Sequence, residues 1–214
     1  MPGTEAAVLP KNIKPLHYQL ELKPDIQNFA FSGNETIDVR VSESSSTIVM
    51  NALDIDIGSA SIAINNSVLK TENIAYNKEA ETCTLTFPEE IPIGEGKIDI
   101  AFTGILNDKL RGFYRSQYID PEGNTQYLAT TQFEATDARQ AFPCWDEPEC
   151  KATFSVTLVV PSHLVALANT PEIENTTLSG GMNSVKFADT PIMSTYLLAF
   201  VDCGCSNPER ANLM

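Results

Sequence analysis

The sequence predicts an all-β fold, either an antiparallel sandwich or a barrel. Apolar and polar residues alternate with a period of two through many short stretches, and residues that favour turns separate those stretches. No long stretch shows the periodicity of a helix. A chain of 214 residues, 43% of them hydrophobic, has the size and composition of one domain with its own core.

The alternation begins after a proline-marked lead-in, residues 1–12, which we expect to be flexible. Tyr18, Leu20 and Leu22 fall on one face of the first predicted strand, and polar residues occupy its other face. Further strands are indicated by the apolar series Phe29 and Phe31; Ile37, Val39 and Val41; Ile48 and Met50; Ile62 and Ile64; Cys83, Leu85 and Phe87; and Ile98, Ile100 and Phe102. Turns are expected at residues 32–34, 42–46 and 65–66 because they are rich in Gly, Asn and Ser.

The second half of the chain continues the pattern. Its apolar series are Phe154, Val156, Leu158 and Val160; Val165 and Leu167; and Val185 and Phe187. A last apolar run covers residues 196–201. The best candidate for a helix is a single turn at residues 136–139, with Thr136 as its N-cap.

The charge balance excludes some classes of partner. The chain has 28 acidic and 14 basic residues and a formal net charge of -14, so phosphate backbones and anionic membranes would repel it. The acidity serves solubility or attracts cationic ligands such as free α-amines. The N-terminus has neither a basic nor an apolar signal region, and no apolar run approaches the ~20 residues of a membrane span. We therefore expect a cytoplasmic protein that binds neither nucleic acid nor membranes.

No catalytic constellation is visible in the sequence. The only two histidines, His17 and His163, have no second histidine four residues away, so the helical zinc motif is missing. The glycine-flanked serine elbow and the glycine-rich nucleotide loops are also missing. The five cysteines are odd in number and irregularly spaced, and we expect free thiols. We predict neither a catalytic residue nor a metal ligand on this chain.

Residues 130–150, TTQFEATDARQAFPCWDEPEC, stand apart because they do not alternate cleanly and contain the only tryptophan. An irregular, residue-rich loop between strands usually has a specific role. Phe142, Pro143 and Trp145 are expected to fill the core. Arg139 is expected to pair with Asp146 or Glu147 and so to stabilise a partly buried turn.

Gln132 and Glu134 are the candidate binding residues in this segment. They are two positions apart, so in an extended stretch they face the same side while Phe133 points into the core. A carboxylate beside an amide on an open face can bind an ammonium group through a charge-assisted hydrogen bond. The residues alone leave a second interpretation open, which is an ordinary solvated strand face.

Four motifs together resemble the N-terminal domain of the M1 (gluzincin) zinc aminopeptidases, including the puromycin-sensitive and fungal cytosolic enzymes. The first is the 130–150 segment, with its Gln132-Phe133-Glu134 element and the run from Ala141 to Pro148. The others are residues 112–116 (GFYRS), residues 193–200 (MSTYLLAF) and the proline-marked opening that leads to Tyr18. The resemblance covers roughly residues 8 to 201 and implies one twisted antiparallel β-sandwich domain over residues 13–201.

The resemblance also implies a function. In the family, the glutamate at the position of Glu134 binds the α-amine of a peptide substrate, and the glutamine at the position of Gln132 lies at the pocket for the first side chain. The zinc ion and the reaction belong to the following catalytic domain, whose Gly-x-Met-Glu-Asn and His-Glu-x-x-His elements do not occur here. The implied partners are peptide N-termini and that catalytic domain. We expect no zinc on this chain and no activity from it alone.

Residues 202–214 depart from the family pattern and are predicted to form a divergent polar tail without strand or helix periodicity. Two functions therefore stay open. The chain is either a substrate-anchoring module of a zinc aminopeptidase or a stand-alone binding or regulatory module from a truncated form. A third interpretation, an enzyme with paired carboxylates such as Asp146 and Glu147, is disfavoured because this pair lies between an aromatic residue and a proline in a structural loop.

Overall fold

The computed structural model describes residues 8–204, and within that range the chain forms three β-sheets and two short 3-10 helices. The largest sheet has eight strands in the order β13-β14-β11-β1-β2-β8-β4-β5. Their bounds are β13 (Glu172–Leu178), β14 (Met182–Phe187), β11 (Thr153–Pro161), β1 (Ile13–Asp25), β2 (Ala30–Val41), β8 (Gly94–Ile105), β4 (Ile55–Ile64) and β5 (Ser67–Lys70).

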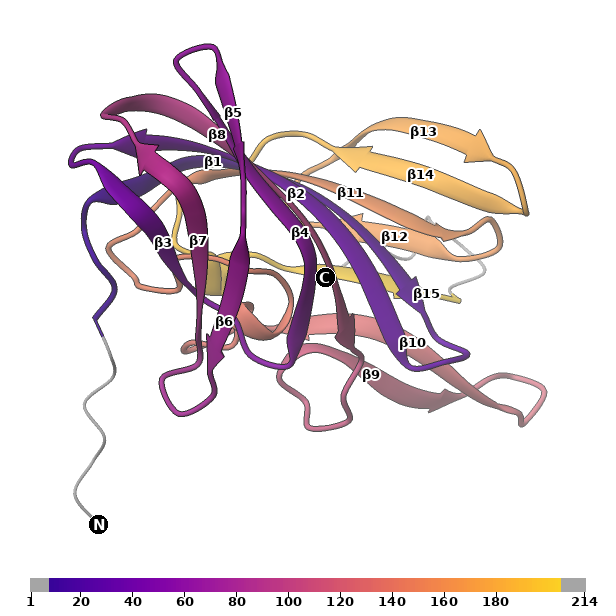
Figure 1. Ribbon diagram of the computed structural model, residues 1–214. Coiled ribbons are helices and arrows are strands. Elements are labelled where there is room, and N and C mark those ends of the chain that lie inside the picture. The colour runs from indigo at the N-terminus through magenta and orange to yellow at the C-terminus, as the bar shows by residue number, and fades with distance from the viewer. Residues whose placement is uncertain (1–7, 205–214) are drawn as a thin grey trace.

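Two smaller sheets complete the sandwich. One contains β12 (Val165–Ala168), β15 (Phe200–Cys203), β10 (Thr125–Gln132) and β9 (Gly112–Ile119), in that order. The other contains β3 (Ser45–Asn51), β7 (Thr82–Ile91) and β6 (Asn73–Asn77). In Figure 1 the three-stranded sheet lies on the left and the four-stranded sheet at the lower right, with the large sheet above and between them. The predicted all-β sandwich is confirmed, and β1 with β11 is the one parallel pair among the described strand pairs.

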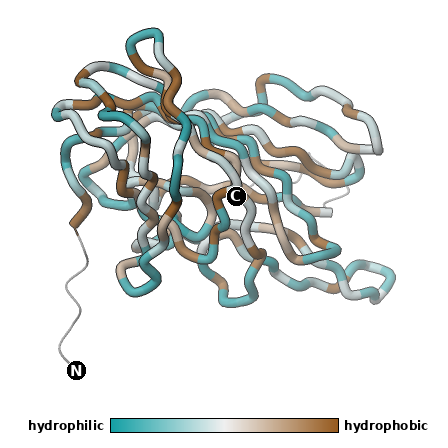
Figure 2. The backbone as a smooth tube through the Cα atoms, in the orientation of Figure 1, coloured by the Kyte–Doolittle hydropathy of each residue, from teal (hydrophilic) through white to brown (hydrophobic). Residues whose placement is uncertain are grey.

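The core lies where the sequence alternation placed it. Tyr18, Leu20 and Leu22 are all 0% exposed, and the other predicted series of β2, β3, β4, β7, β8, β11 and β14 are buried as well, except for Phe29, which lies half-buried in the turn before β2. Figure 2 shows the resulting alternation of hydrophobic and hydrophilic residues along the strands. A chain of aromatic contacts crosses between the large and the four-stranded sheet: the ring centroids of Phe31 and Phe113 lie 5.0 Å apart, and those of Phe113 and Phe200 5.1 Å apart.

Four local predictions were wrong. Residues 32–34 continue β2 instead of turning, because both neighbouring strands, β1 and β8, pair with them. Ala166 is buried in β12 and Leu167 is exposed, since pairing with β15 sets the register and a shift of one residue reverses the faces. The helical turn is η1 (Ala138–Gln140), with Asp137 at its N-cap in place of Thr136. The apolar run at 196–201 starts in a second 3-10 helix, η2 (Thr195–Leu197), before it becomes β15.

The two ends of the described range are joined to the sandwich. Leu9, within the predicted lead-in, is 4% exposed, and its backbone N–H donates to Glu147 Oε1 at 2.9 Å. β15 extends to Cys203, two residues past the predicted domain boundary at 201, because Asp202 and Cys203 pair with β10 and β12. The rest of the lead-in and of the predicted tail, residues 1–7 and 205–214, lies outside the described residues. Within residues 8–204, no helix is long and apolar enough to cross a membrane.

Candidate functional site

Gln132 and Glu134 lie at the end of β10, where the strand leaves the four-stranded sheet. Gln132 is the last residue of β10, and both side chains are exposed, whereas Phe133 between them is 1% exposed. The Phe133 ring packs edge-on against Phe142 and Phe200, with centroids 6.1 Å and 6.0 Å apart. The inward position of Phe133 is therefore confirmed. The binding roles of Gln132 and Glu134 stay predictions.

The backbone that carries these two residues is fixed from both sides. Gln132 pairs with Gly112 of β9, and Thr131 Oγ1 accepts the Phe200 N–H at 3.0 Å. Beyond Glu134, the peptide bond to Ala135 is cis, and the Asp137 N–H then donates to the Phe133 carbonyl at 2.9 Å. Residues 133–137 thus form a closed turn that follows directly on the strand.

The predicted ion pair between Arg139 and Asp146 is present and lies buried next to the turn. Asp146 is 3% exposed, and its Oδ2 accepts hydrogen bonds from Arg139 Nε at 3.0 Å and from the Arg139 N–H at 3.3 Å. Its Oδ1 accepts the Thr195 hydroxyl at 2.7 Å. Arg139 also reaches Glu81 on the other side, at 3.0 Å. Phe142, Pro143 and Trp145 are buried between this ion pair and β1, which confirms them as core residues.

The charges around the turn leave Glu134 available. The guanidinium of Arg139 is the cation nearest to it in sequence, and that group is already engaged by Asp146 and Glu81. Within residues 8–204, the Glu134 carboxylate has neither an ion pair nor a hydrogen bond. An exposed carboxylate without a cation can bind an ammonium group without first breaking an internal contact.

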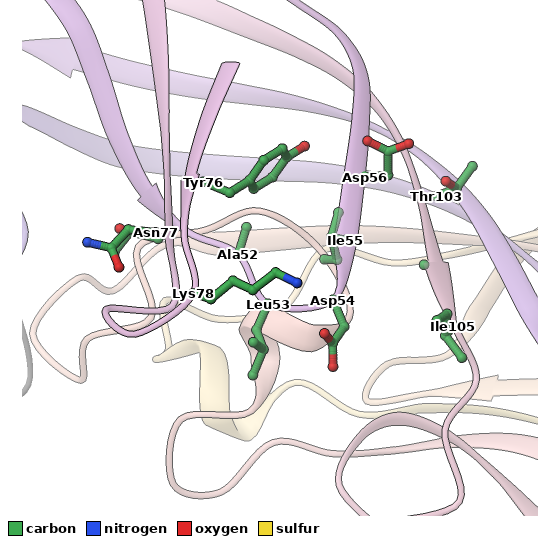
Figure 3. A pocket seen from close by; sticks show the side chains of 12 residues that line it. Ala52, Leu53, Asp54, Ile55, Asp56, Tyr76, Asn77, Lys78, Thr103 and Ile105 are labelled. Atoms are coloured by element: carbon green, nitrogen blue, oxygen red, sulfur yellow. The ribbon is translucent and has the colours of Figure 1, made fainter.

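Two cavities of the domain are lined by residues other than Gln132 and Glu134. Figure 3 shows a cavity of about 360 Å³ between β6 and the strands β4 and β8, with Tyr76 and Lys78 on one side and Asp54, Asp56 and Ile105 on the other. Neither Gln132 nor Glu134 lines it. A larger cavity of about 810 Å³ approaches the turn and is lined by Thr136 and Arg139. Gln132 and Glu134 therefore form an open platform, and a substrate side chain would need further walls from elsewhere.

The structure also brings together a serine, a histidine and an aspartate that the sequence analysis did not connect. Ser155 Oγ lies 3.0 Å from His17 Nε2 and donates to Asp189 Oδ1 at 2.5 Å, while Thr153 Oγ1 lies 2.7 Å from His17 Nδ1. In a nucleophilic triad the carboxylate holds the histidine, not the serine. Here the carboxylate of Asp189 contacts the serine and not the histidine, and Ser155 is only 7% exposed. We therefore interpret these hydrogen bonds as structural links between β1, β11 and the segment after β14. The parallel pairing of β1 with β11 brings His17 beside Thr153 and Ser155, and nothing in the residue pattern indicates that pairing.

The possible metal ligands are scattered over the described residues, and core cysteines such as Cys83 are free thiols. In the part of the chain that the structure describes, no group of three or more His, Cys, Asp or Glu side chains is arranged to hold a metal ion. Cys83, Cys144 and Cys150 are free thiols. Burial raises the pKa of Cys83 to about 12 and that of Cys150 to about 11, which keeps both in the unreactive thiol form at neutral pH.

The family follows from comparison with known proteins. The model of the peptidase M1 N-terminal domain matches residues 14–197, and this chain therefore belongs to the peptidase M1 family. Aminopeptidase 2 of Candida albicans is 44% identical over 198 residues, which are 92% of this chain and 21% of the relative.

Two further relatives match this chain with similar identity and coverage. The alanine/arginine aminopeptidase of Saccharomyces cerevisiae is 45% identical over 91% of this chain and 23% of its own length. The puromycin-sensitive aminopeptidase of Caenorhabditis elegans is 43% identical over 90% of this chain and 20% of its own length. The chain thus spans about a fifth of the length of the relatives it matches.

Proposed function

We propose that this chain is the substrate-anchoring domain of a zinc aminopeptidase, which removes N-terminal amino acids from peptides. The observation that carries the proposal is the platform at the end of β10, within a domain of the M1 family. Glu134 would bind the α-ammonium group of the peptide, and Gln132 would contact the first side chain. The net charge of -14 adds an attractive field for such a cationic end.

The chemistry itself would take place outside this chain. The zinc ion of the family acts as a Lewis acid that activates water, and the described residues offer no ligand set that fits it. The partner that we propose is the catalytic domain, which would supply both the metal and the missing walls around the open platform. On this view residues 8–204 bind and orient the substrate and do not act alone. The proposed location is the cytoplasm.

The test is a kinetic measurement on a full-length enzyme that carries this domain. Changing Glu134→Ala and Gln132→Ala together removes the proposed amine contact, so kcat/KM for a peptide substrate should fall at least about tenfold, or ~1.4 kcal/mol of transition-state stabilisation. The matched control changes an exposed acid and an exposed glutamine of the same hairpin, Glu122→Ala with Gln117→Ala. If both double variants keep the original kcat/KM, the assignment of the site is wrong.

A further inference from the structure

Gln140 is a buried glutamine close in sequence to the platform. It ends the 3-10 helix η1, and only 6% of its surface is exposed. Glutamine is rarely buried without a hydrogen-bonding function, because an unpartnered amide in the interior costs about 1–3 kcal/mol. Its Nε2 donates to Asp137 Oδ1 at 2.5 Å. The side chain therefore connects η1 to the turn that carries Glu134.

The first connection runs through Asp137. The Asp137 N–H closes the turn by donating to the Phe133 carbonyl, and Glu134 is the residue that follows Phe133. Because the Gln140 amide holds the Asp137 side chain, it also limits the positions that the Asp137 backbone can take. The amide thus acts on the position of Glu134 through one residue and without contacting it.

The second connection runs through Gly112. This glycine has a φ of +68° and is the strand partner of Gln132. A Cβ atom on Gly112 would lie 2.6 Å from Gln140 Cβ and 3.3 Å from Gln140 Cδ, so the Gln140 side chain packs directly on the Gly112 backbone. The same side chain therefore supports the strand position that pairs with Gln132.

We propose that Gln140 is a positioning residue that fixes the spacing between Gln132 and Glu134 for binding a primary amine. The inference rests on the proposed function, since it concerns the same platform. Both connections come from one side chain: the contact with Gly112 reaches Gln132 through the strand pair, and the bond to Asp137 reaches Glu134 through the turn. If Gln140 loses its amide, the turn and the strand end can move independently, and the two groups no longer meet one ammonium group together.

The experiment uses the full chain and solution NMR. The protein is titrated in separate experiments with leucinamide, which has a free α-amine, and with N-acetyl-leucinamide, which has none. The backbone amide chemical shifts of residues 132–135 report binding. The unsubstituted chain should bind leucinamide and ignore the acetylated ligand. Gln140→Met keeps the length and packing of the side chain but removes the hydrogen bond to Asp137, and it should weaken leucinamide binding at least about fivefold.

The control is a glutamine in a matching bond at the far end of the same hairpin. Gln126 Nε2 donates to Asp120 Oδ2 at 3.1 Å, and Gln126→Met should leave leucinamide binding unchanged. Should Gln140→Met fold poorly, Asp137→Ala breaks the same bond from its half-exposed end, while Asp137→Asn retains the acceptor oxygen and should restore binding. A purely structural role for Gln140 would not produce this rescue.

Two results would overturn the inference, and they have different meanings. If Gln140→Met folds and binds leucinamide as tightly as the unsubstituted chain, Gln140 does not position the platform, and the proposed function is unaffected. If the unsubstituted chain binds both ligands equally, the platform does not recognise an amine, and the proposed function falls together with this inference. If it binds neither ligand, Gln140 does not hold a ready amine site in this chain and the inference falls, whereas the proposed function is decided by the kinetic test on the full-length enzyme.

Discussion

The inner face of the large sheet and the irregular segment at residues 133–150 both bury side chains, but they satisfy their polar groups differently. In the sheet, the backbone ladder uses the N–H and C=O groups, and the inward side chains are mostly apolar. The irregular segment has turn bonds and one isolated antiparallel bridge, between Asn51 and Cys144, in place of a ladder, and buried side chains supply further hydrogen bonds. Asp146 alone accepts three hydrogen bonds, from the N–H and Nε of Arg139 and from Thr195.

Buried acidic side chains on the strands have fewer hydrogen-bond partners than Asp146 has in the irregular segment. Glu35 of β2 is 3% exposed, and neither of its carboxyl oxygens has a hydrogen-bond partner among the described residues. Burial, which no hydrogen bond within residues 8–204 offsets, raises the pKa of Glu35 well above the usual range of a carboxyl group. Asp202 of β15 is intermediate, because Oδ1 accepts the Ala129 N–H at 2.6 Å and Oδ2 has no partner there. A regular strand has few free donors to offer a buried acid, whereas an irregular segment can be built around one.

The largest effect is expected from removing Asp146. Asp146→Ala would leave Arg139, whose side chain is 11% exposed, with only Glu81 as an ion-pair partner. Breaking a buried pair from one side typically costs 3–5 kcal/mol, and we expect the free energy of unfolding to fall by about that much. Urea unfolding followed by the fluorescence of Trp145, the single tryptophan, measures it directly.

The control for this change is the exposed acid Glu149 in the same segment. Its ion pair with Lys11 leaves the two side chains 62% and 71% exposed, so Glu149→Ala should leave the free energy of unfolding almost unchanged. Equal losses in the two variants would show that the segment is not organised around Asp146, and the contrast with the sheet would disappear.

Asp202 gives the next effect, and it depends on pH. Burial raises the pKa of Asp202 from the ordinary 3.8 of an aspartate to about 6, so the native state holds this proton more tightly than the unfolded chain does. The contribution of Asp202 to stability is therefore complete below about pH 4 and is lost as the pH rises through about 6. A shift of about two units corresponds to at most about 3 kcal/mol.

The measurement compares unfolding free energies between pH 4 and pH 7 in the parent chain and in Asp202→Asn. The asparagine retains an oxygen for the Ala129 N–H but cannot ionise, so the stability lost over this range should shrink by about 1–3 kcal/mol. Subtracting the two curves removes the contributions of the other acids. Parallel curves would mean that Asp202 ionises in the native state as easily as in the unfolded chain.

The same contrast explains what could be predicted from the sequence. Period-two alternation identified the buried residues of β1, β2, β7 and β8, because one side of each strand meets the core. The prediction failed at Gly33, which lies in a Ser-Gly-Asn sequence typical of turns but pairs with a neighbouring strand on each side. It also failed at Leu167, which lies on an edge strand whose register is set by its neighbour β15. Local composition does not contain this pairing information.

The platform was predicted in part, for a related reason. The spacing of Gln132, Phe133 and Glu134 was enough to place Phe133 inside and its neighbours outside. The support from Gln140 and Gly112 was not visible, because it depends on contact between η1 and β9. The contact between His17 and Ser155 could not be predicted for the same reason. These two residues are 138 positions apart in the sequence, and the parallel pair of β1 and β11 brings them together. Tertiary contacts decide these features.

The smallest effect tests the apolar side of the comparison. Gly104 of β8 stands opposite Phe31 of β2, and Gly33 stands opposite Phe102, so each glycine is covered by the ring of its partner. A Cβ atom on Gly104 would collide with the Phe31 ring, which also packs on Phe113 of the four-stranded sheet. We expect Gly104→Ala to lower the free energy of unfolding by about 1–3 kcal/mol, the usual cost of overpacking.

Gly58 of β4 provides the matched control, because a Cβ atom there would have no neighbour closer than 3.8 Å. Gly58→Ala removes the same backbone freedom from the unfolded chain without the collision, and it should be neutral or stabilise by up to about 1 kcal/mol. The double variant Gly104→Ala with Phe31→Leu should recover part of the loss, since the smaller side chain leaves room for the new methyl group. If the double variant recovers nothing, the stability lost in Gly104→Ala comes from the backbone and not from the collision with Phe31. Side-chain packing would then matter less in the sheet than the Asp146 hydrogen bonds matter in the irregular segment.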